Sequence, residues 1–388
     1  MKILKTIRDI DVEDKRVLVR ADFNVSLDVE GGVVDDFRIR ATIPTIKLLM
    51  EGGAKIILMS HLGKPLKTQN HSLSLKPIAQ RLSELINKKV ILAPDCVGSE
   101  VERLVSEIAA GDVLLLENLR FHAEEEGGDA DFARRLAALG EIYVNDAFAV
   151  CHRPHASVSA ITKFLPSYAG LLLAKEVEVL LKVIQNPERP LVVIVGGAKI
   201  STKIKLIKKF LSVADQVIVG GALVNNILQV QGMAVGRSLV EPEAAEAIKE
   251  LQLTSNKIHI PVDTVVSENT SGQAAVRLAP VGKTGQKELI LDIGPETEEL
   301  FSEIIAQGKT VLWNGPMGFF ETPAFAHGTE AIAQAVAKAS YSVIGGGETV
   351  AFVEKLGLVD KFSFVSTGGG AMLEFLSGET MPGLEALN

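Results

Sequence analysis

Short runs of aliphatic and β-branched residues alternate with segments of helical periodicity along almost the whole chain, and this alternation constrains the fold more than any other feature. Most runs are nearly continuously apolar, which is typical of strands that helices cover on both faces. The pattern predicts βαβ units and mainly parallel sheets. We expect strands at Arg16–Arg20, Lys55–Ser60, Val113–Leu116, Glu141–Val144, Leu191–Val195, Gln216–Val219, His259–Val262, Thr310–Trp313, Tyr341–Ile344 and Phe362–Val365.

Helical segments are predicted between these strands, at Arg38–Met50, at Lys76–Leu85 and from Pro295 onward. At about 150 residues per domain, a chain of 388 residues is most simply divided into two domains. No fixed-period repeat or low-complexity linker separates the halves. The expected boundary is therefore a helix, Ala174–Gln185, which Asn186 and Pro187 terminate.

Composition and charge exclude several classes of protein. The 40 basic and 48 acidic side chains give a net charge of −8, which excludes a general basic coat for nucleic acid or membranes. The two cysteines, Cys96 and Cys151, cannot form a disulfide framework. The first 16 residues lack a signal-peptide core, and no window approaches the ~18 apolar residues of a membrane span. We expect a cytoplasmic protein with no nucleic-acid or membrane partner.

The residues directly after the strands carry the functional signal, because open α/β sheets bind ligands beyond the carboxyl ends of their strands. In the first half these loops are basic and rich in hydrogen-bond donors. They read Ala21-Asp22-Phe23-Asn24, His61-Leu62-Gly63-Lys64-Pro65, Asn118-Leu119-Arg120-Phe121-His122 and Asn145-Asp146-Ala147-Phe148, continuing to Cys151-His152-Arg153-Pro154-His155.

In the second half the same positions are rich in glycine, where backbone amides can approach a ligand closely. The loops read Gly196-Gly197-Ala198-Lys199, Gly220-Gly221-Ala222, Asn314-Gly315-Pro316-Met317-Gly318, Gly345-Gly346-Gly347-Glu348 and Ser366-Thr367-Gly368-Gly369-Gly370. A basic pocket and a glycine-rich pocket on separate sheets indicate two different anionic ligands. Transfer of a group between those ligands is the natural hypothesis.

Individual residues support phosphate binding in the second pocket. Lys199 and Lys203 are expected near a helix start, where cations oppose the helix dipole unless an anion lies beside them. Three consecutive glycines at 368–370 precede another helical run and can direct free amides at an anion. Glu321 and Glu348 could reach a ribose or a nucleotide-bound Mg²⁺.

Other motifs are weaker. Gly282-Lys283-Thr284 imitates a P-loop, but Arg277 stands where that motif needs glycine, and Pro280 is expected to interrupt any preceding strand. No G-x-G-x-x-G opens a helix, which argues against a dehydrogenase. Zinc at His152 and His155 lacks a complete ligand set, and a nucleophilic role for Cys151 has no further support. His61 is expected to donate to an oxyanion, although a structural histidine fits the spacing equally well.

Taken in order, these blocks resemble the signatures of phosphoglycerate kinase from near the first residues to within about twenty of the last. The resemblance implies two doubly wound, Rossmann-like parallel-sheet α/β domains, joined by a helix and a hinge. The expected segments are a phosphoglycerate-binding domain 1–170, an interdomain helix 171–186 and a nucleotide-binding domain 187–377, with 378–388 returning to the first. The matching blocks are Arg20-Ala21-Asp22-Phe23-Asn24-Val25, Ser60-His61-Leu62-Gly63, Leu116-Glu117-Asn118-Leu119-Arg120-Phe121, Asn145-Asp146-Ala147-Phe148, Gly196-Gly197-Ala198-Lys199, Trp313-Asn314-Gly315-Pro316-Met317-Gly318 and Ser366-Thr367-Gly368-Gly369-Gly370.

What the resemblance implies is reversible, in-line phosphoryl transfer between 1,3-bisphosphoglycerate and MgADP after hinge closure, in a monomeric glycolytic enzyme. It places Arg38, Lys199 and Gly368, Gly369 and Gly370 around the transferred group, with Glu348 near the nucleotide-bound Mg²⁺. The phosphoglycerate positions are Asp22, Phe23, Asn24, Arg38, His61, Leu62, Gly63, Lys64, Arg120 and Arg153. The nucleotide positions are Gly196, Gly197, Lys203, Gly220, Gly221, Asn314, Pro316, Glu321, Gly345, Gly346, Gly347, Glu348 and Thr349.

The sequence departs from the usual family pattern in a few places. Lys64 stands where arginine is common, which keeps the charge but loses bidentate geometry. Glu348 replaces the usual aspartate, Ala149–Pro154 differs from the typical stretch, and Gly220-Gly221-Ala222 lacks a third glycine. Alternatives at this point are another nucleotide-dependent carboxylate kinase and a non-catalytic nucleotide-binding protein of the same fold.

Overall fold

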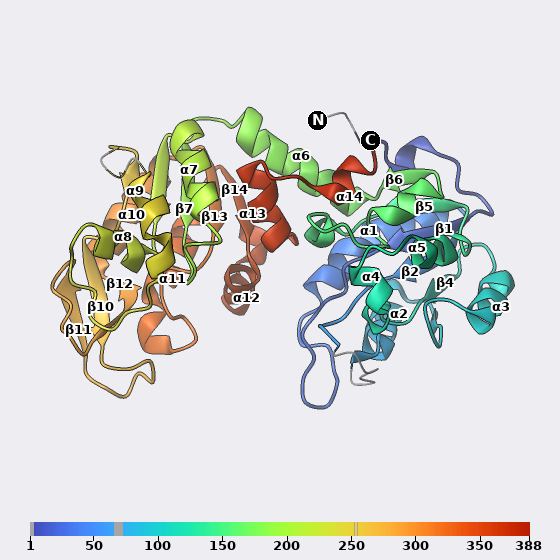
Figure 1. Cartoon of the computed structure of the whole chain (residues 1–388), viewed down its shortest axis with the longest axis horizontal. Coiled ribbons are helices and arrows are strands. Elements are labelled where there is room, and N and C mark those ends of the chain that lie inside the picture. The colour runs from blue at the N-terminus through green and yellow to red at the C-terminus, as the bar shows by residue number, and fades with distance from the viewer. Residues whose placement is uncertain (1–3, 66–72, 252, 254) are drawn as a thin grey trace. The chain divides into compact units, whose positions relative to one another are not determined.

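The computed structural model describes residues 4–65, 73–251, 253 and 255–388. The chain forms two compact units, which are unit 1 (Met1–Glu178 with Glu379–Asn388) and unit 2 (Val179–Gly378). Helix α6 (Leu171–Gln185) contributes residues to both units. The last residues belong to unit 1, where the Gly383 amide donates to the Cys151 carbonyl at 2.8 Å, and α14 is the red helix beside the blue and green elements (Figure 1).

Unit 1 is built on a six-stranded parallel sheet with the order β3-β4-β2-β1-β5-β6. Its strands are β1 (Arg16–Arg20), β2 (Lys55–Met59), β3 (Val90–Leu92), β4 (Val113–Leu115), β5 (Ile142–Asn145) and β6 (Ser167–Ala169). Its helices are α1 (Phe37–Glu51), α2 (Lys76–Ile86), α3 (Ser99–Glu107), α4 (Ala123–Glu126), α5 (Ala130–Ala137) and α14 (Pro382–Glu385), with 3-10 turns η1 (Ile7–Asp9), η3 (Leu119–Phe121), η4 (Phe148–Val150) and η5 (Ala160–Lys163).

Both faces of this sheet are buried, because alternate residues of a strand point to opposite sides. Val17 and Val19 of β1 pack in one apolar cluster with Ile46 of α1 and Leu82 of α2. The intervening Leu18 packs in a second cluster, which also contains residues of α3 and α5. The continuous apolar character of the strand sequences follows from this burial on both sides.

Unit 2 contains a second six-stranded parallel sheet with the order β15-β14-β13-β7-β8-β9, and a separate antiparallel sheet with the order β11-β10-β12. The strands are β7 (Leu191–Val195), β8 (Gln216–Val219), β9 (Ile258–His259), β10 (Asp263–Ser267), β11 (Val276–Pro280), β12 (Leu289–Ile293), β13 (Thr310–Asn314), β14 (Tyr341–Gly345) and β15 (Phe364–Val365). The helices are α7 (Ile204–Val213), α8 (Val224–Val230), α9 (Ala245–Lys249), α10 (Pro295–Gln307), α11 (His327–Val336), α12 (Gly347–Lys355) and α13 (Gly370–Ser377), with 3-10 turns η6 (Pro242–Ala244), η7 (Pro323–Phe325) and η8 (Val359–Lys361).

The predicted fold class, two parallel-sheet α/β domains, is confirmed, and most predicted strands agree with the structure to within one residue. The strand expected at His259–Val262 is wrong, because β9 ends at His259 and the chain turns into β10. Strands β3 and β6 and the antiparallel sheet were not predicted. Pro280 ends β11 and does not interrupt it, since a proline is tolerated at the end of an edge strand. The segment Gly282-Lys283-Thr284 leads on to strand β12, so it is not a P-loop.

The strand orders locate the switch points where the chain reverses its direction across each sheet. In unit 1 this point lies between β1 and β5, and in unit 2 between β7 and β13. The two loops that leave a switch point diverge, so a crevice opens at the carboxyl ends of those strands. Within the described residues, no helix is long and apolar enough to span a membrane.

Candidate active site

The loop after β1 fixes an arginine at the switch point of unit 1. The Asp22 carboxylate, only 3% exposed, accepts from the Arg38 guanidinium at 2.6 Å. The Asn24 side-chain oxygen accepts from the Gly63 amide at 2.8 Å, which joins this loop to the loop after β2. Asp22, Asn24 and Arg38, predicted as substrate-binding residues, therefore lie together.

His61, in the loop after β2, is buried against a buried arginine. Arg20 Nη2 lies 3.2 Å from His61 Nδ1, and because arginine can only donate, Nδ1 accepts and the proton resides on Nε2. Burial lowers the pKa of His61 well below its ordinary value, and the positive charges of Arg20, Arg120 and Arg38 lower it further. His61 is thus a neutral imidazole at neutral pH.

Two further arginines follow β4 and β5. The Asn118 side chain accepts from the amides of Leu62 and Arg120, at 3.2 Å and 3.0 Å, and so connects the loops after β2 and β4. Arg120 Nη1 donates to the Gly63 carbonyl at 2.7 Å. Arg153 Nε donates to His152 Nε2 at 3.0 Å, which requires that nitrogen to be the acceptor.

The basic groups of unit 1 lie close enough to repel one another. Burial and the charges of Arg20, Arg120 and Arg153 lower the pKa of His155 to about 3. Burial and the Arg153 charge lower the pKa of His152 to about 4. Clustered like charges destabilise the folded state unless an anion neutralises them. The predicted basic edge is therefore suited to a multiply charged anion.

In unit 2, three glycine-containing loops pack at the β7–β13 switch point. The Gly197 amide donates to the Pro316 carbonyl at 2.7 Å, and the Gly221 amide to the Met317 carbonyl at 3.1 Å. A Cβ on Gly221, which has a φ of +68°, would lie 2.5 Å from the Gly197 nitrogen and 2.7 Å from the Pro316 oxygen. Only glycine allows these loops to approach so closely.

A cavity of about 330 Å³ opens beside these loops. Most of its lining is apolar, including Leu239, Leu291 and Pro316, whereas Glu321 and Glu348 contribute carboxylates. Asp292 lies in the wall, and burial raises the pKa of its carboxyl to about 8. A concave, mainly apolar surface with a few polar groups suits a small organic ligand such as a nucleobase with its sugar.

Lys199 and Lys203, predicted as a pair, occupy different environments. The Lys199 side chain is exposed, whereas Lys203 is 9% exposed and donates to the Gly196 carbonyl at 2.5 Å. Burial lowers the pKa of Lys203 to about 8, and the Glu348 carboxylate opposes that shift. Lys203 therefore stabilises the glycine loop, and of the two lysines Lys199 is the one exposed to solvent.

Two helices of unit 2 begin at the predicted glycine runs. Helix α12 has Gly346 as its N-cap, with a φ of +98°, and Glu348 in its first turn. Helix α13 has Gly369 as its N-cap, with a φ of +51°. No heavy atom lies within 4 Å of the position that a Cβ would take on Gly347 or Gly370. The first amides of a helix have no acceptor within that helix, so helix starts such as these favour bound anions.

Sequence reasoning missed the residues that hold the basic site in place. Arg20 is wholly buried and donates to the Ser157 hydroxyl at 2.8 Å, and that hydroxyl donates to Glu125 at 2.6 Å. Glu125 is itself 0% exposed, which is unusual for a charged side chain. Its position in a run of three glutamates concealed it. Cys151 is buried and burial raises its pKa to about 12, so it is not a thiolate nucleophile.

Comparison with known proteins decides the family. The sequence model described as "Phosphoglycerate kinase" matches residues 7–379. The chain belongs to the phosphoglycerate kinase family. It is 48% identical over 390 residues to the phosphoglycerate kinase of Aquifex aeolicus, covering 99% of this chain and 98% of that protein. It is 47% identical to the wheat protein named "Phosphoglycerate kinase, cytosolic", with 99% and 98% covered.

Solved structures of phosphoglycerate kinases support the same family. The phosphoglycerate kinase of Coxiella burnetii superposes with a TM-score of 0.86 at 38% identity, and that of Pyrococcus horikoshii with 0.88 at 31%; both cover 99% of this chain and 98% of theirs. As a phosphoglycerate kinase family member over nearly its whole length, the chain is a glycolytic kinase. It acts on small molecules, transferring a phosphoryl group between 1,3-bisphosphoglycerate and ADP, and nothing favours the alternatives.

Proposed function

We propose that unit 1 binds the phosphoglycerate at its basic edge and that unit 2 binds the nucleotide in its glycine-lined cavity. The observation that supports this division is the opposite chemistry of the two switch points. In unit 1, the charges of Arg20, Arg38 and Arg120 act on His61, and that of Arg153 acts on the nearby His155. In unit 2, packed glycine loops border a mainly apolar cavity. Each set of groups suits one of the two substrates.

In unit 1, Arg38, Arg120 and Arg153 bind the phosphate and carboxylate groups of the phosphoglycerate as charge-assisted donors. His61 is neutral with its proton on Nε2, so it donates a hydrogen bond and does not act as a general base. Asp22 and Asn24 keep Arg38 and the loop after β2 in position. Phe23, Leu62, Gly63 and Lys64 complete the loops at this edge.

In unit 2, the loops after β7, β8 and β13 bind the adenosine and its phosphates. Gly196, Gly197, Gly220, Gly221 and Pro316 form the close-packed wall, and Glu321 faces the ribose. The Asn314 Nδ2 atom is buried without a hydrogen-bond partner, so a donor is available here for an acceptor on the ligand. Gly345, Gly346, Gly347 and Thr349 place the start of α12 beside the phosphates.

Mg²⁺ is expected with the nucleotide, and the groups in unit 2 fit it. Mg²⁺ in kinases is held by one or two carboxylates together with the phosphates. Glu348 provides one exposed carboxylate on the cavity wall, at the first turn of α12. When bound, Mg²⁺ neutralises part of the phosphate charge. We propose Glu348, directly or through water, as the residue that holds it.

Catalysis by this chain then consists of alignment and of stabilising negative charge, because phosphoryl transfer passes through a loose transition state. Lys199 presents an exposed ammonium group, Arg38 a guanidinium group, and Gly369 and Gly370 the amides at the start of α13. Gly368 precedes this start, and its amide donates to the Ser366 hydroxyl at 3.0 Å. No described side chain needs to act as a base. Water must be excluded from the site, because it would hydrolyse the acyl phosphate. We predict that closure of the two domains, which the resemblance implies, excludes it.

A coupled assay with 3-phosphoglycerate and MgATP tests the proposed sites. We expect Arg120→Ala to raise the KM for 3-phosphoglycerate with little effect on the KM for ATP, and Gly197→Ala to do the reverse. Equal effects of both variants on both KM values would contradict the division between units.

We also propose that the enzyme is a cytoplasmic monomer. Sedimentation tests the monomeric state, and cell fractionation tests the location.

A further inference from the structure

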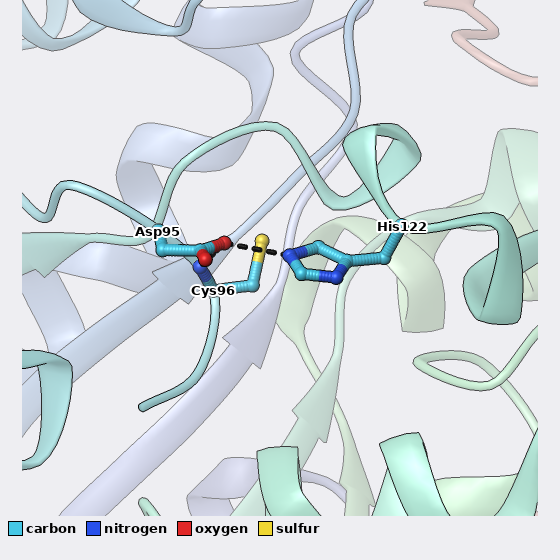
Figure 2. A group of neighbouring side chains, drawn as sticks. All are labelled: Asp95, Cys96 and His122. Atoms are coloured by element: carbon cyan, nitrogen blue, oxygen red, sulfur yellow. Dashed lines mark hydrogen bonds and ion pairs between the residues drawn. The ribbon is translucent and has the colours of Figure 1, made fainter. Parts of the chain in front are cut away.

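Unit 1 brings a carboxylate, a thiol and an imidazole together away from the proposed substrate and nucleotide groups. Asp95 and Cys96 lie between β3 and α3, and His122 directly follows η3. One oxygen, the sulfur and one ring nitrogen all lie within 4.8 Å of one another. Figure 2 shows the three side chains converging from two separate segments. Among the residues that the structure describes, this is the one cluster with three such ligand atoms.

The ligand atoms lie between 2.6 Å and 4.8 Å apart, a range that includes the spacing in a metal site. His122 Nε2 lies 2.6 Å from Asp95 Oδ1, and the Cys96 thiol donates to the Glu117 carbonyl at 2.9 Å. In a tetrahedral zinc site with the usual bond lengths, neighbouring ligand atoms are about 3.3–3.6 Å apart. A cation would replace the Asp95–His122 hydrogen bond and separate the two side chains by less than about 1 Å.

Neighbouring groups hold the three side chains in orientation. The Cys96 amide donates to Asp95 Oδ1 at 2.6 Å, and the His122 ring stacks on Phe132 with centroids 5.0 Å apart at 27°. Such outer contacts orient metal ligands. The Cys96 side chain is buried, while 43% of the Asp95 side chain and 20% of the His122 side chain are exposed. A cation can therefore approach Asp95 and His122 from solvent, and the buried sulfur lies within 4.8 Å of their ligand atoms.

We propose that Asp95, Cys96 and His122 bind a thiophilic divalent cation such as Zn²⁺, with water as the fourth ligand. A sulfur, nitrogen and oxygen donor set suits Zn²⁺ or Co²⁺ and does not suit Mg²⁺, which prefers oxygen alone. Binding requires the Cys96 thiolate, so the cation displaces the thiol proton to solvent. The site ties the loop after β3 to the segment after η3.

Titration of the full chain with Co²⁺, without nucleotide, tests the site. We expect one Co²⁺ per chain, with a near-ultraviolet thiolate-to-cobalt charge-transfer band that Zn²⁺ abolishes by displacement. C96S should lose the band, and H122Q should weaken binding by roughly a hundredfold or more, since even outer contacts to a ligand contribute about 10- to 100-fold. C151S, which removes the other buried thiol, is the matched control and should retain the band.

A second measurement guards against a variant that does not fold. A ligand that binds only the native state raises the melting temperature, so Zn²⁺ should stabilise the wild type and C151S but not H122Q. His122 is partly exposed, so H122Q is expected to fold, as circular dichroism can verify. The absence of a thiolate band in the wild type, or its persistence in C96S, would overturn the proposal. Equal stabilisation of H122Q would do the same.

Discussion

Single residues of the same type have different functions here, as Lys199 and Lys203 illustrate. Lys199→Ala should lower kcat by about 100- to 1,000-fold, the range for losing one preorganised stabilising group. Nucleotide affinity should change little, because the exposed Lys199 side chain supports no part of the fold. Steady-state kinetics together with calorimetric nucleotide titration measures both effects. Lys209→Ala, an exposed lysine on α7, is the control, and an unchanged kcat in Lys199→Ala would exclude the proposed role.

Glu348 is proposed to contribute to activity by holding the Mg²⁺ that accompanies the nucleotide. Glu348→Gln keeps the shape of the side chain but removes the charge near the cavity wall. We expect the Mg²⁺ concentration for half-maximal activity to rise roughly tenfold, which corresponds to about 1.4 kcal/mol. Glu354→Gln, on the last turn of the same helix, serves as the control. Superimposable Mg²⁺ titrations of Glu348→Gln and wild type would show that the metal does not use this carboxylate.

At the scale of elements, the packing of the loops after β7, β8 and β13 depends on Gly221. Gly221→Ala should destabilise unit 2 through its positive φ, by about 1 kcal/mol, and through overpacking against Gly197 and Pro316, by about 1–3 kcal/mol more. Nucleotide binding should weaken as well. Gly232→Ala is the matched control, since its φ is +78° but no atom lies within 4 Å of the added Cβ.

Urea unfolding and nucleotide titration of the two variants separate these causes. Gly232→Ala should show the loss due to φ alone and normal nucleotide affinity. If both variants lose the same stability and both bind nucleotide normally, close packing of the loops has no part in the site.

The elements also show what can be inferred from sequence. Continuous apolar runs such as Leu191–Val195 identified the central strands, because burial on both faces leaves no polar residue. Strand β11 was missed because Val276, Arg277 and Leu278 are all exposed on an edge strand, so no burial pattern marks it. The loops at the strand ends were predicted from the position of ligand sites in parallel sheets.

Contacts between distant segments could not be inferred from sequence. Arg20 lies at the end of a strand and looks like a surface charge, yet it is wholly buried and donates to Ser157, 137 positions further along. Asp95 and Cys96 meet His122 only because β3 and β4 are neighbours in the sheet. Local patterns carry no information on such pairings.

At the scale of the molecule, the two units respond differently to acid. In unit 1 the pKa values of His61, His152 and His155 are lowered, mainly by burial. Below about pH 6.5 the unfolded chain binds protons at these positions and the folded unit does not, so stability falls as the pH falls. Asp146, with a pKa raised to about 6, opposes this trend between about pH 6 and pH 4. The three histidines outweigh this single carboxyl, so the net stability of unit 1 still falls.

In unit 2 the balance is reversed. The pKa of Asp292 is raised to about 8, so the folded unit binds this proton between about pH 8 and pH 4 and gains stability as the pH falls. Burial lowers the pKa of His259, which offsets part of that gain below about pH 6.5. The single tryptophan, Trp313, is buried in unit 2 and reports on that unit alone. Circular dichroism reports on both units.

We therefore expect acid to separate the unfolding of the two units. At about pH 5.5 the buried histidines His61 and His155 should each destabilise unit 1 by at most about 1.4 kcal/mol relative to pH 7.5, which is about 3 kcal/mol together. The urea transition followed by circular dichroism should then begin at a lower urea concentration than the Trp313 fluorescence transition, while the two lie closer together at pH 7.5. His155→Gln cannot titrate, so it should bring the two transitions nearer to each other at about pH 5.5. If acid instead shifts both transitions equally in the wild type, the neutral histidines are not the cause, because a group buried in unit 1 can lower only the stability of the unit that buries it.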